Sequence, residues 1–470
     1  MAIPVSVDSM VWVEEDKLPP PFLTNIKEDF TFTCSVFDPT ATRFTKKPSF
    51  TTKKVETFIR VEGWLGLPYD KGLKLFQNNK KFSVQKNLSD GFPAKYPKNP
   101  DPNHPNASPN QDQLIADALG EAKSKGSFML QAPTGCGKTA VALSVIAGLS
   151  RTALIIVDSR NLARQWVDEI KSLLGLSDDD IGLMIGGKLD YEGKAVVVAV
   201  IHNLVATGKV WPEEFFSYFG CVVWDEAHIL GSDQFALTMG LFNARVRVGL
   251  TATPERKDGC HELFFNYFGE PSVIGSSDAL ASLCLVYERQ GIYRKGFGPK
   301  LISELTEDHS RNVEVADIVA DLYLNDNRRV IVLSERIEQL QILMGLLIDD
   351  WNIPEADIGM MTRKWVTAEG KEIPVKDSEL KHFMDHSKII LATYKMAAKA
   401  INIPTLDAGV EASPVSDVVQ AIGRIRRPLP NKRTPVWVTI FDKGTNSLER
   451  KYYSRISELK KVNVEVANYE

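Results

Sequence analysis

The sequence predicts an α/β protein in which two domains with parallel sheets follow each other, preceded by a small β-rich domain. From residue 128 onward, continuously apolar segments alternate with helical patterns. Strands that are apolar at every position are covered on both faces, which is typical of parallel sheets. The segment PKNPDPNHPNASPN, residues 97–110, reads as a linker that separates this pattern from the N-terminal part. We therefore expect domains at residues 1–100, 101–280 and 281–470.

The N-terminal domain is basic in an otherwise acidic chain. Between Arg43 and Lys98 the sequence has thirteen lysine and arginine residues and four acidic ones, a net charge of +9 in a chain of −4. Aromatic residues lie between these charges, on segments such as VETFIRVEGWLGL and KKFSVQ that we expect to form strands. Cations for phosphates and aromatic faces for bases indicate a DNA-engaging surface. The alternative is a small β-rich domain whose aromatics are its core and whose lysines are a solvated face.

Two series of apolar strands define the parallel-sheet domains. The first series consists of FMLQ (128–131), ALIIVD (153–158), AVVVAVI (195–201), CVVW (221–224) and RVGLTATP (247–254). The second consists of RRVIVLS (328–334), KIILATY (388–394) and VWVTIFD (436–442). Amphipathic segments such as LARQWVDEIKSLL lie between the strands and are predicted to be crossover helices.

A turn between the first of these strands and the helix TAVALSVIAGL is predicted to bind the phosphates of ATP. Gly135 and Gly137 let backbone N–H groups point inward, and the helix adds the positive end of its dipole. Lys138 would reach the β- and γ-phosphates, and Thr139 would bind Mg²⁺. Ala132 replaces the first glycine of the usual GxxxxGK[ST] pattern. A chance glycine-rich loop is the alternative, but the strand before and the helix after favour the nucleotide site. The predicted nucleotide-binding residues of the turn are Pro133, Thr134, Gly135, Cys136, Gly137, Lys138 and Thr139.

A second motif, Asp225-Glu226-Ala227-His228, follows the apolar strand CVVW. Ligands of open parallel sheets gather at the carboxyl ends of the strands, which places these acids beside the phosphate-binding turn. Asp225 would hold Mg²⁺, and Glu226 would orient and deprotonate the attacking water. His228 would report nucleotide state to neighbouring loops. Two acids after a strand can also be a helix cap, and a single histidine is often structural.

Composition sets limits on the class of protein. The five cysteines are far apart without a CxxC pair, so neither a zinc site nor a disulfide framework is indicated. The N-terminus lacks a basic start followed by a long apolar core, and no apolar run approaches the length of a membrane span. We therefore expect a soluble, intracellular protein without a membrane partner.

Taken in order, several segments resemble superfamily 2 helicases: APTGCGKT, DEAH, GLTATPERKDG, KIILATYKMAAKAINIP and VVQAIGRIRRP. The resemblance covers roughly residues 108–440. Within the superfamily the chain is similar to the branch that holds phage recombination helicases acting on branched DNA and the TFIIH-type transcription/repair helicase. This resemblance implies two RecA-like domains with ATP and Mg²⁺ at their interface and nucleic acid running across both.

The resemblance also assigns roles to single residues. It implies adenine recognition by Gln111, although Asn110 replaces the usual aromatic residue. It implies coupling of hydrolysis to strand movement by Thr251 and Thr253, and completion of the ATP site by residues of the second domain: Gln420, Gly423, Arg424 and Arg427. It implies DNA contacts by Ser159, Arg160, Arg256, Ser334, Arg336 and Thr393. At Lys399 the sequence departs from the family, which has an acid there, and we expect this cation to lie near the DNA path and to contact the backbone.

The catalytic prediction rests on five residues: Lys138, Asp225, Glu226, Arg424 and Arg427. Arginines that neutralise charge on the γ-phosphoryl oxygens accelerate hydrolysis. Taken alone, the segment RIRRP would read as a basic helix end near a proline. Its position after a complete set of first-domain motifs favours the catalytic interpretation.

The function that follows is an ATP- and Mg²⁺-dependent DNA helicase or translocase. We expect a monomeric motor on duplex, forked or branched DNA, in replication, recombination or repair of a phage or similar genome. If the protein is phage-encoded, its location is the cytoplasm of the infected bacterial host. Two alternatives stay open: a translocase that remodels RNA or a transcription complex, and an ATP-gated clamp that binds DNA without unwinding it.

Overall fold

The structure is a computed structural model of the 470-residue chain. It describes residues 2–37, 50–102, 110–133, 136–206, 210–256, 258–275, 282–294, 298–366, 371–400, 403–415, 418–426, 429, 432–462 and 464–469. The chain divides into two compact units, residues 1–277 (unit 1) and residues 278–470 (unit 2). The predicted domain limits at residues 100 and 280 say which parts of the chain fold independently, and they stay predictions.

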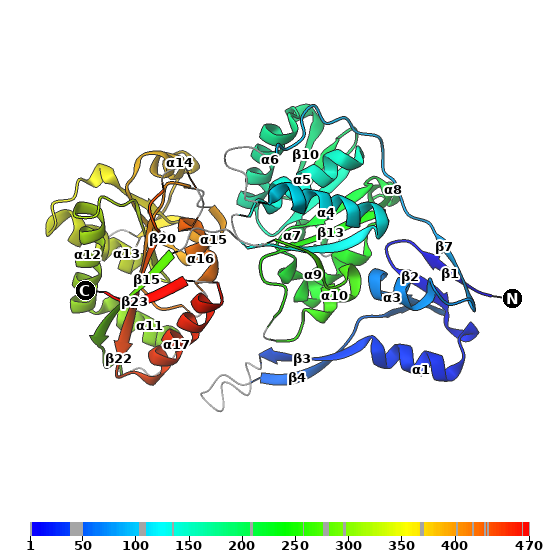
Figure 1. Ribbon diagram of the computed structural model, residues 1–470, viewed down its shortest axis with the longest axis horizontal. Coiled ribbons are helices and arrows are strands. Elements are labelled where there is room, and N and C mark those ends of the chain that lie inside the picture. The colour runs from blue at the N-terminus through cyan, green and yellow to red at the C-terminus, as the bar shows by residue number, and fades with distance from the viewer. Residues whose placement is uncertain are drawn as a thin grey trace. The chain divides into compact units, whose positions relative to one another are not determined.

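Unit 1 begins with a five-stranded sheet of order β5-β6-β2-β1-β7. Its strands are β1 (Ile3–Val7), β2 (Val11–Glu14), β5 (Ile59–Val61), β6 (Trp64–Leu67) and β7 (Phe82–Lys86). Two helices accompany it, α1 (Pro20–Asp29) and α3 (Tyr69–Phe76). A separate antiparallel hairpin consists of β3 (Thr31–Phe37) and β4 (Phe50–Glu56) (Figure 1). The β-rich N-terminal region is therefore confirmed.

The larger sheet of unit 1 is parallel throughout, with the order β10-β11-β9-β12-β13-β8-β14. Its strands are β8 (Ser127–Gln131), β9 (Ala153–Val157), β10 (Ile181–Met184), β11 (Val196–Val200), β12 (Cys221–Trp224), β13 (Val246–Thr251) and β14 (Pro271–Ile274). The helices are α4 (Gln111–Ser124), α5 (Lys138–Leu149), α6 (Arg160–Leu174), α7 (Ile201–Leu204), α8 (Glu213–Ser217), α9 (Asp233–Ala236) and α10 (Glu262–Phe268).

The two faces of this parallel sheet are covered differently. On one face, α4, α5 and α6 pack their apolar side chains against residues such as Leu130 and Ile155. On the other, the N-terminal sheet and α10 share one core with Met129, Leu154 and Ile156. The N-terminal region therefore covers the first parallel sheet and excludes water from it.

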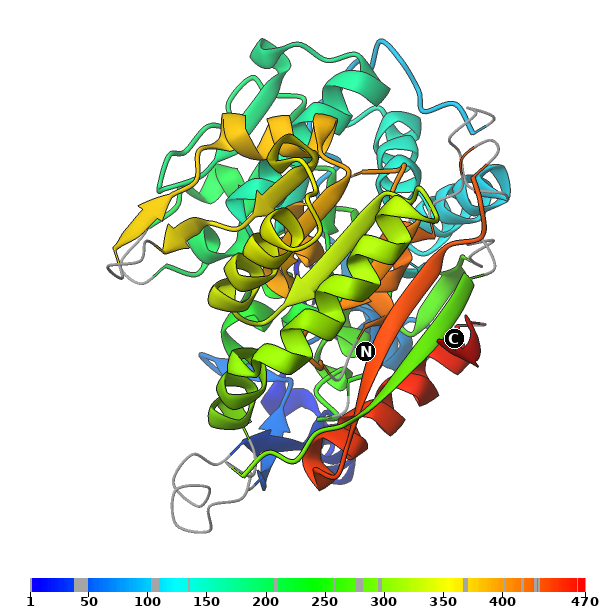
Figure 2. The same ribbon diagram turned by 90° about the vertical axis from the view of Figure 1, so that its left-hand side faces the viewer.

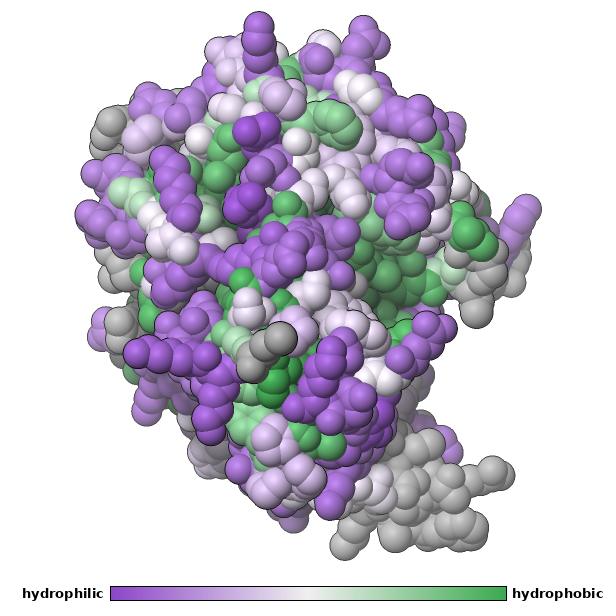
Figure 3. Space-filling view, turned by 90° about the vertical axis from the view of Figure 1, so that its right-hand side faces the viewer, coloured by the Kyte–Doolittle hydropathy of each residue, from purple (hydrophilic) through white to green (hydrophobic). Residues whose placement is uncertain are grey.

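The aromatic residues of the N-terminal region belong to this core. Phe58, Tyr69 and Phe76 are buried, and Phe76 packs edge-on against Phe82 with ring centroids 4.7 Å apart. These rings cannot stack on bases without unfolding the region, so the platform of aromatic faces predicted from the sequence is wrong for them. Hydrophilic side chains cover most of the surface on this side of the molecule (Figure 3).

A buried arginine, Arg247, connects the N-terminal region to the parallel sheet. Arg247 on β13 is 1% exposed and donates hydrogen bonds to the carbonyl oxygens of Asp8 (2.7 Å) and Phe242 (3.3 Å). Its guanidinium lies 4.0 Å from the centre of the Tyr69 ring, and burial lowers its pKa to about 10. The buried cation is held by these groups because removing it from water is otherwise costly.

We expect Arg247→Ala to destabilise unit 1 by about 3 kcal/mol, through a cavity and an unpaired Asp8 carbonyl. The matched control is Arg245→Ala, two residues earlier, where the guanidinium is half exposed and pairs with Asp90 at the surface. An exposed ion pair contributes about 0–1 kcal/mol, so this control should change little. Urea unfolding measures the free energy of unfolding of both variants. Equal losses would show that Arg247 does not hold the N-terminal region on the parallel sheet.

Unit 2 holds a second parallel sheet of order β17-β20-β16-β21-β22-β15-β23. Its strands are β15 (Ser282–Gln290), β16 (Val330–Ser334), β17 (Ile358–Met361), β20 (Ile389–Thr393), β21 (Ala408–Glu411), β22 (Val436–Lys443) and β23 (Val464–Asn468). Strands β15 and β22, far apart in sequence, lie side by side (Figure 2). A small hairpin, β18 (Lys364–Val366) and β19 (Glu372–Pro374), lies apart from the sheet.

The helices of unit 2 follow its strands as crossover connections. They are α11 (Gly298–Glu307), α12 (His309–Leu324), α13 (Ile337–Asp349), α14 (Asp377–His386), α15 (Tyr394–Ala400), α16 (Val419–Ile425) and α17 (Asn446–Lys461). Both units thus have the parallel α/β fold of RecA-like domains, as predicted. The strands that sequence reasoning missed, such as β10 and β17, are short and contain glycine, which hides their apolar pattern.

Candidate nucleotide-binding and hydrolysis site

The predicted phosphate-binding turn lies at the carboxyl end of β8 in unit 1. At the end of the turn, Gly137 is the N-cap of α5 and has a left-handed conformation (φ 72°). The Lys138 ammonium donates a hydrogen bond to the carbonyl oxygen of Ala132 at 2.7 Å, which folds its side chain back over the turn. Ala132 itself donates its N–H to Thr251 at the end of β13 (3.0 Å). The turn is therefore anchored to the neighbouring strand of the sheet.

Gln111 lies directly against this turn. A Cβ atom at position 137 would meet the Gln111 Oε1 atom at 2.7 Å, so the Gln111 side chain would have to shift, and the left-handed backbone itself favours glycine. Gln111 is buried as the first residue of α4. Asn110, which replaces the aromatic residue of related helicases, is the left-handed N-cap of that helix (φ 59°), a conformation that asparagine tolerates well.

Asp225 and Glu226 follow β12, two strands away from β8 in the sheet. The Asp225 carboxylate is 9% exposed and held on both oxygens: Trp166 Nε1 donates to Oδ2 (2.8 Å) and the Glu226 N–H donates to Oδ1 (3.0 Å). Burial raises the pKa of Asp225 to about 6; the Glu226 carboxylate adds to the rise, and the Trp166 hydrogen bond and the Lys138 charge oppose it. The structure thus brings Lys138 and Asp225 into one electrostatic environment.

Glu226 has a left-handed backbone (φ 51°), which is uncommon for a residue with a side chain. Such strain persists where surrounding structure imposes it and is frequent at functional sites. Here the Asp225 side chain caps the Glu226 N–H, and a 3-10 helix (Ala227–Gly231) begins at once. The Glu226 Oε2 atom lies 3.2 Å from Nδ1 of His228, so the two side chains predicted for catalysis and coupling are in contact.

Arg256 connects this motif to the segment after β13. Its guanidinium binds both oxygens of Asp258 (3.0 and 2.6 Å) and donates to the carbonyl oxygen of His228 at 2.7 Å. These bonds use three of the five guanidinium donors and make Arg256 a brace between two loops. Direct DNA contact by Arg256 stays a prediction.

The coupling residues Thr251 and Thr253 lie at the end of β13. Thr251 is fully buried, and its Oγ1 accepts the Thr253 N–H at 3.2 Å, while Thr253 is exposed. Because the Thr251 carbonyl also holds Ala132, a shift of this strand end would move the phosphate-binding turn. The position fits a coupling role, which stays a prediction.

The residues predicted to contact DNA differ in how accessible they are. Arg160, at the start of α6, is exposed, whereas Arg336, just before α13, is partly buried and donates a hydrogen bond to the Pro299 carbonyl oxygen (3.2 Å). Ser159 and Thr393 accept backbone N–H groups at the starts of α6 and α15. Ser334 is fully buried and donates to Gln339 (2.6 Å), so its hydroxyl has no surface to offer DNA, contrary to the prediction.

Some predicted site residues lie outside the described part of the chain. These are Thr134, Gly135 and Arg427, together with the side chains of Gln420 and Lys399. Gly423 and Arg424 are described, on α16 of unit 2. Pro133, Cys136 and Thr139 occupy the ends of the turn and the first turn of α5, and the Cys136 N–H donates to the Pro133 carbonyl (3.3 Å).

The donor set of unit 1 fits a nucleoside triphosphate with Mg²⁺. A helix N-terminus behind a glycine that must lack a side chain provides space and N–H groups for phosphates. Lys138 supplies a cation, and the buried Asp225 carboxylate is the hard oxygen ligand that Mg²⁺ prefers. Sequence reasoning missed the bond from Trp166 to Asp225 and the brace formed by Asp258; only the fold brings these residues together.

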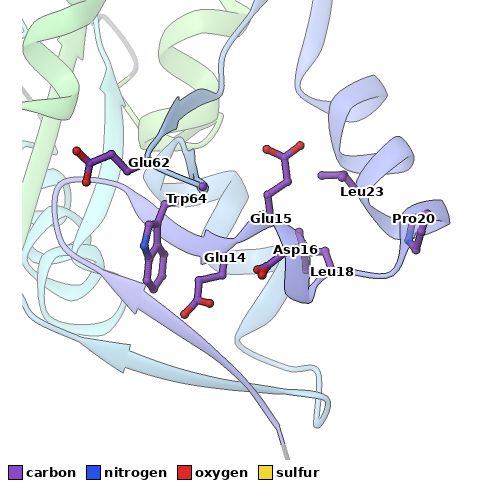
Figure 4. Close-up of a pocket in the computed structure, with 9 residues that line it drawn as sticks. Glu14, Glu15, Asp16, Leu18, Pro20, Leu23, Glu62 and Trp64 are labelled. Atoms are coloured by element: carbon purple, nitrogen blue, oxygen red, sulfur yellow. The ribbon is translucent and has the colours of Figure 1, made fainter.

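A pocket of about 620 Å³ on the N-terminal region does not belong to this site (Figure 4). It is lined by Glu14, Glu15, Asp16, Leu18, Pro20, Leu23, Glu62, Gly63 and Trp64. Its acids are partly paired, Glu15 with Lys27 (2.9 Å) and Arg60 (3.1 Å). An acidic lining repels phosphate, so we exclude this pocket from any nucleic-acid surface.

Comparison with known proteins agrees with this geometry. Residues 104–256 match a family model described as Type III restriction enzyme, res subunit. A putative ATP-dependent RNA helicase of Acanthamoeba polyphaga mimivirus is 22% identical over 374 residues, covering 76% of this chain and 68% of that protein. The DNA 3'-5' translocase XPB2 of Sulfurisphaera tokodaii is 36% identical over 132 residues, covering 28% of each chain.

Among solved structures, Saccharomyces cerevisiae Dbp5 bound to RNA and ADP BeF3 matches with a TM-score of 0.51 and 15% identity, covering 77% of this chain and 90% of that one. This likeness shows the fold alone. No helix in the described part of the chain is long and apolar enough to cross a membrane. The ordered motifs, the two parallel-sheet units and these comparisons together show that the chain resembles superfamily 2 helicases.

Proposed function

We propose that the protein is an ATP- and Mg²⁺-dependent DNA translocase or helicase that acts on duplex, forked or branched DNA in replication, recombination or repair. One observation carries the proposal: Lys138, Asp225 and Glu226 gather at the carboxyl edge of one parallel sheet, and Glu226 contacts His228. Bound Mg²⁺ would supply charge neutralisation on the phosphates. Around it, Asp225 offers a fixed carboxylate, Lys138 offers a cation, and Glu226 is the base that takes a proton from water.

The choice of DNA over RNA rests on similarity alone. The XPB2 relative is named a DNA translocase, whereas the mimiviral relative is named a putative RNA helicase. The N-terminal region adds a net charge of +9 between residues 43 and 98, which suits a phosphate backbone of either kind. The substrate is therefore tested by measuring ATPase rate with fork, duplex, single-stranded DNA and RNA in parallel. Stimulation by RNA alone would overturn the proposal.

Hairpin β3–β4 carries part of this basic region, because Lys53 and Lys54 lie on β4. Its buried face, with Cys34 and Val55, lies toward the rest of unit 1, and the Ser35 N–H donates to the Asp258 carbonyl at 2.9 Å. A two-stranded hairpin is marginally stable alone, so these contacts hold it. On the opposite face Thr33 and Lys54 are paired across the strands and exposed, a hydroxyl beside a cation, which suits phosphate contacts.

We expect Lys54→Glu to weaken DNA binding and to reduce the slope of log affinity against log salt by about 1, because each phosphate contact contributes about 0.9 to that slope. Lys123→Glu, an exposed charge reversal on α4 outside the basic region, is the matched control. Fluorescence anisotropy at several salt concentrations measures both. Equal affinity and slope for the two variants would make the hairpin lysine a solvated charge. Point variants are preferable to deleting residues 1–100, because deletion would uncover the core and Arg247.

An ATP-gated clamp is the second candidate, since the same site would serve it. A clamp would bind DNA on ATP addition and leave the duplex intact, whereas a helicase would release a labelled strand. Strand-displacement assays on forked and branched DNA therefore separate the two activities.

A further inference from the structure

The buried face of α6 contains one residue that core packing alone does not explain. Ala163, Trp166, Ile170 and Leu174 follow helical spacing and are all buried. Three of them are aliphatic, but Trp166, 2% exposed, carries an N–H group that must find an acceptor when it is removed from water. Its acceptor is Oδ2 of Asp225, at 2.8 Å, the carboxylate predicted to hold Mg²⁺.

This bond completes the restraint of Asp225. The Glu226 N–H occupies Oδ1 at 3.0 Å, and the indole N–H occupies Oδ2, so rotation of the carboxylate would break one bond or the other. Each carboxylate oxygen accepts two hydrogen bonds or ligands, so both keep a position for a cation. Groups that hold a metal ligand in place are known to change metal affinity by 10- to 100-fold when removed.

The same helix begins at the residues predicted to touch nucleic acid. Ser159 is the N-cap of α6, with its hydroxyl accepting the Leu162 N–H, and Arg160 is exposed beside it. Trp166 lies six residues after Arg160, about 9 Å along a continuous helix. The helix is continuous over its fifteen residues, so a displacement of its N-terminus would be carried toward the indole.

We propose that Trp166 is a positioning residue that orients Asp225 for Mg²⁺ with ATP and links that orientation to nucleic acid at the start of α6. The proposal rests on the proposed function for its second half. Its first half concerns only the nucleotide site of unit 1 and is testable without nucleic acid. The alternative is that the indole only fills space in the core and does not position Asp225.

The chain provides a matched control one residue from Asp225. Trp224 is also buried, at the end of β12, and its indole N–H donates to Thr238 Oγ1 at 3.1 Å, away from the carboxylate. Trp166→Phe and Trp224→Phe thus each remove one buried indole N–H from the same region. Only the first removes a bond to the predicted Mg²⁺ ligand.

The test measures binding of a fluorescent ATP analogue as Mg²⁺ is titrated, with Mn²⁺ binding by electron paramagnetic resonance as a second readout. We expect Trp166→Phe to raise the Mg²⁺ concentration for half-maximal binding by about 10-fold and to leave Mg²⁺-free nucleotide binding unchanged. Trp224→Phe should keep the wild-type Mg²⁺ requirement. Identical Mg²⁺ titrations for the two variants would overturn the positioning role.

The second half of the proposal, the link to nucleic acid, is tested by the ratio of DNA-stimulated to basal ATPase rate at saturating Mg²⁺. We expect this ratio to fall at least fivefold in Trp166→Phe and to stay within twofold of wild type in Trp224→Phe. A normal ratio in Trp166→Phe would remove the link to nucleic acid. If the wild-type protein itself shows no stimulation by any nucleic acid, the proposed function fails, while the Mg²⁺ titration still decides the positioning role.

Thermal unfolding accompanies each variant. If Trp166→Phe does not fold, Trp166→His supplies the comparison, because its ring keeps an N–H donor. A folded Trp166→His protein with a wild-type Mg²⁺ requirement supports the positioning role. A folded Trp166→His protein whose Mg²⁺ requirement rises as far as that of a donor-free Trp166→Leu protein contradicts it.

Discussion

Glu226→Gln is expected to lower ATP turnover by a factor on the order of 10²–10⁴ while ATP binding persists, because an amide cannot take the proton of the attacking water. Asp225 and Lys138 remain in place to hold the nucleotide, so the variant should accumulate a bound, unhydrolysed complex. Lys138→Ala should abolish turnover as well, but through loss of the cation at the phosphates, and should weaken binding. Steady-state phosphate release and equilibrium nucleotide binding measure the two effects separately.

The control for Glu226→Gln is Glu213→Gln, which neutralises an exposed acid of unit 1 at the start of α8. It should hydrolyse ATP at the wild-type rate. Wild-type turnover in Glu226→Gln would remove the assigned general base, and the left-handed backbone at this residue would then need another explanation.

Arg424→Ala and Arg427→Ala are expected to lower turnover by a factor on the order of 10³–10⁵ with a much smaller loss of ATP affinity. The prediction rests on the resemblance, in which arginines of the second domain meet the γ-phosphate as charge develops on it. Interactions formed mainly in the transition state change the rate more than ground-state binding. Single-turnover hydrolysis and nucleotide binding give the two quantities.

Arg450→Ala removes an exposed arginine of α17 in the same unit and is the control. If Arg424→Ala or Arg427→Ala instead loses ATP binding and keeps its rate per bound nucleotide, that arginine is a ground-state ligand. The prediction that arginines of the second domain accelerate hydrolysis would then be wrong.

The chemistry of the candidate nucleotide site could be predicted from the sequence because its residues form two short motifs, each made of neighbouring residues. The turn 132–139 and the acids Asp225 and Glu226 each follow an apolar strand, and carboxyl ends of parallel strands meet at one edge. The place of Gln111 at this site followed only from resemblance, and its proximity to Gly137, across 25 intervening residues, is seen only in the structure. For the turn and the two acids, a local pattern predicted the position and the fold only had to be parallel.

Burial misled the sequence reasoning in the N-terminal region and in unit 2. Phe58, Tyr69 and Phe76 lie among lysines in the sequence, yet they are core: Tyr69 and Phe76 begin and end the helix α3, and Phe58 lies between β4 and β5. Ser334 looked like a backbone contact and is a buried donor to Gln339.

By itself, therefore, the sequence determined the strand and helix alternation and the parallel sheets, and it predicted the residues of a nucleotide site, since these depend on periodicity and on short motifs. Tertiary structure alone decided the strand order, the sharing of one core between the N-terminal region and the first parallel sheet, and the bond from Trp166 to Asp225. The reason is that 58 residues separate Trp166 from Asp225, and such contacts are set by how helices pack on a sheet, which no local pattern encodes.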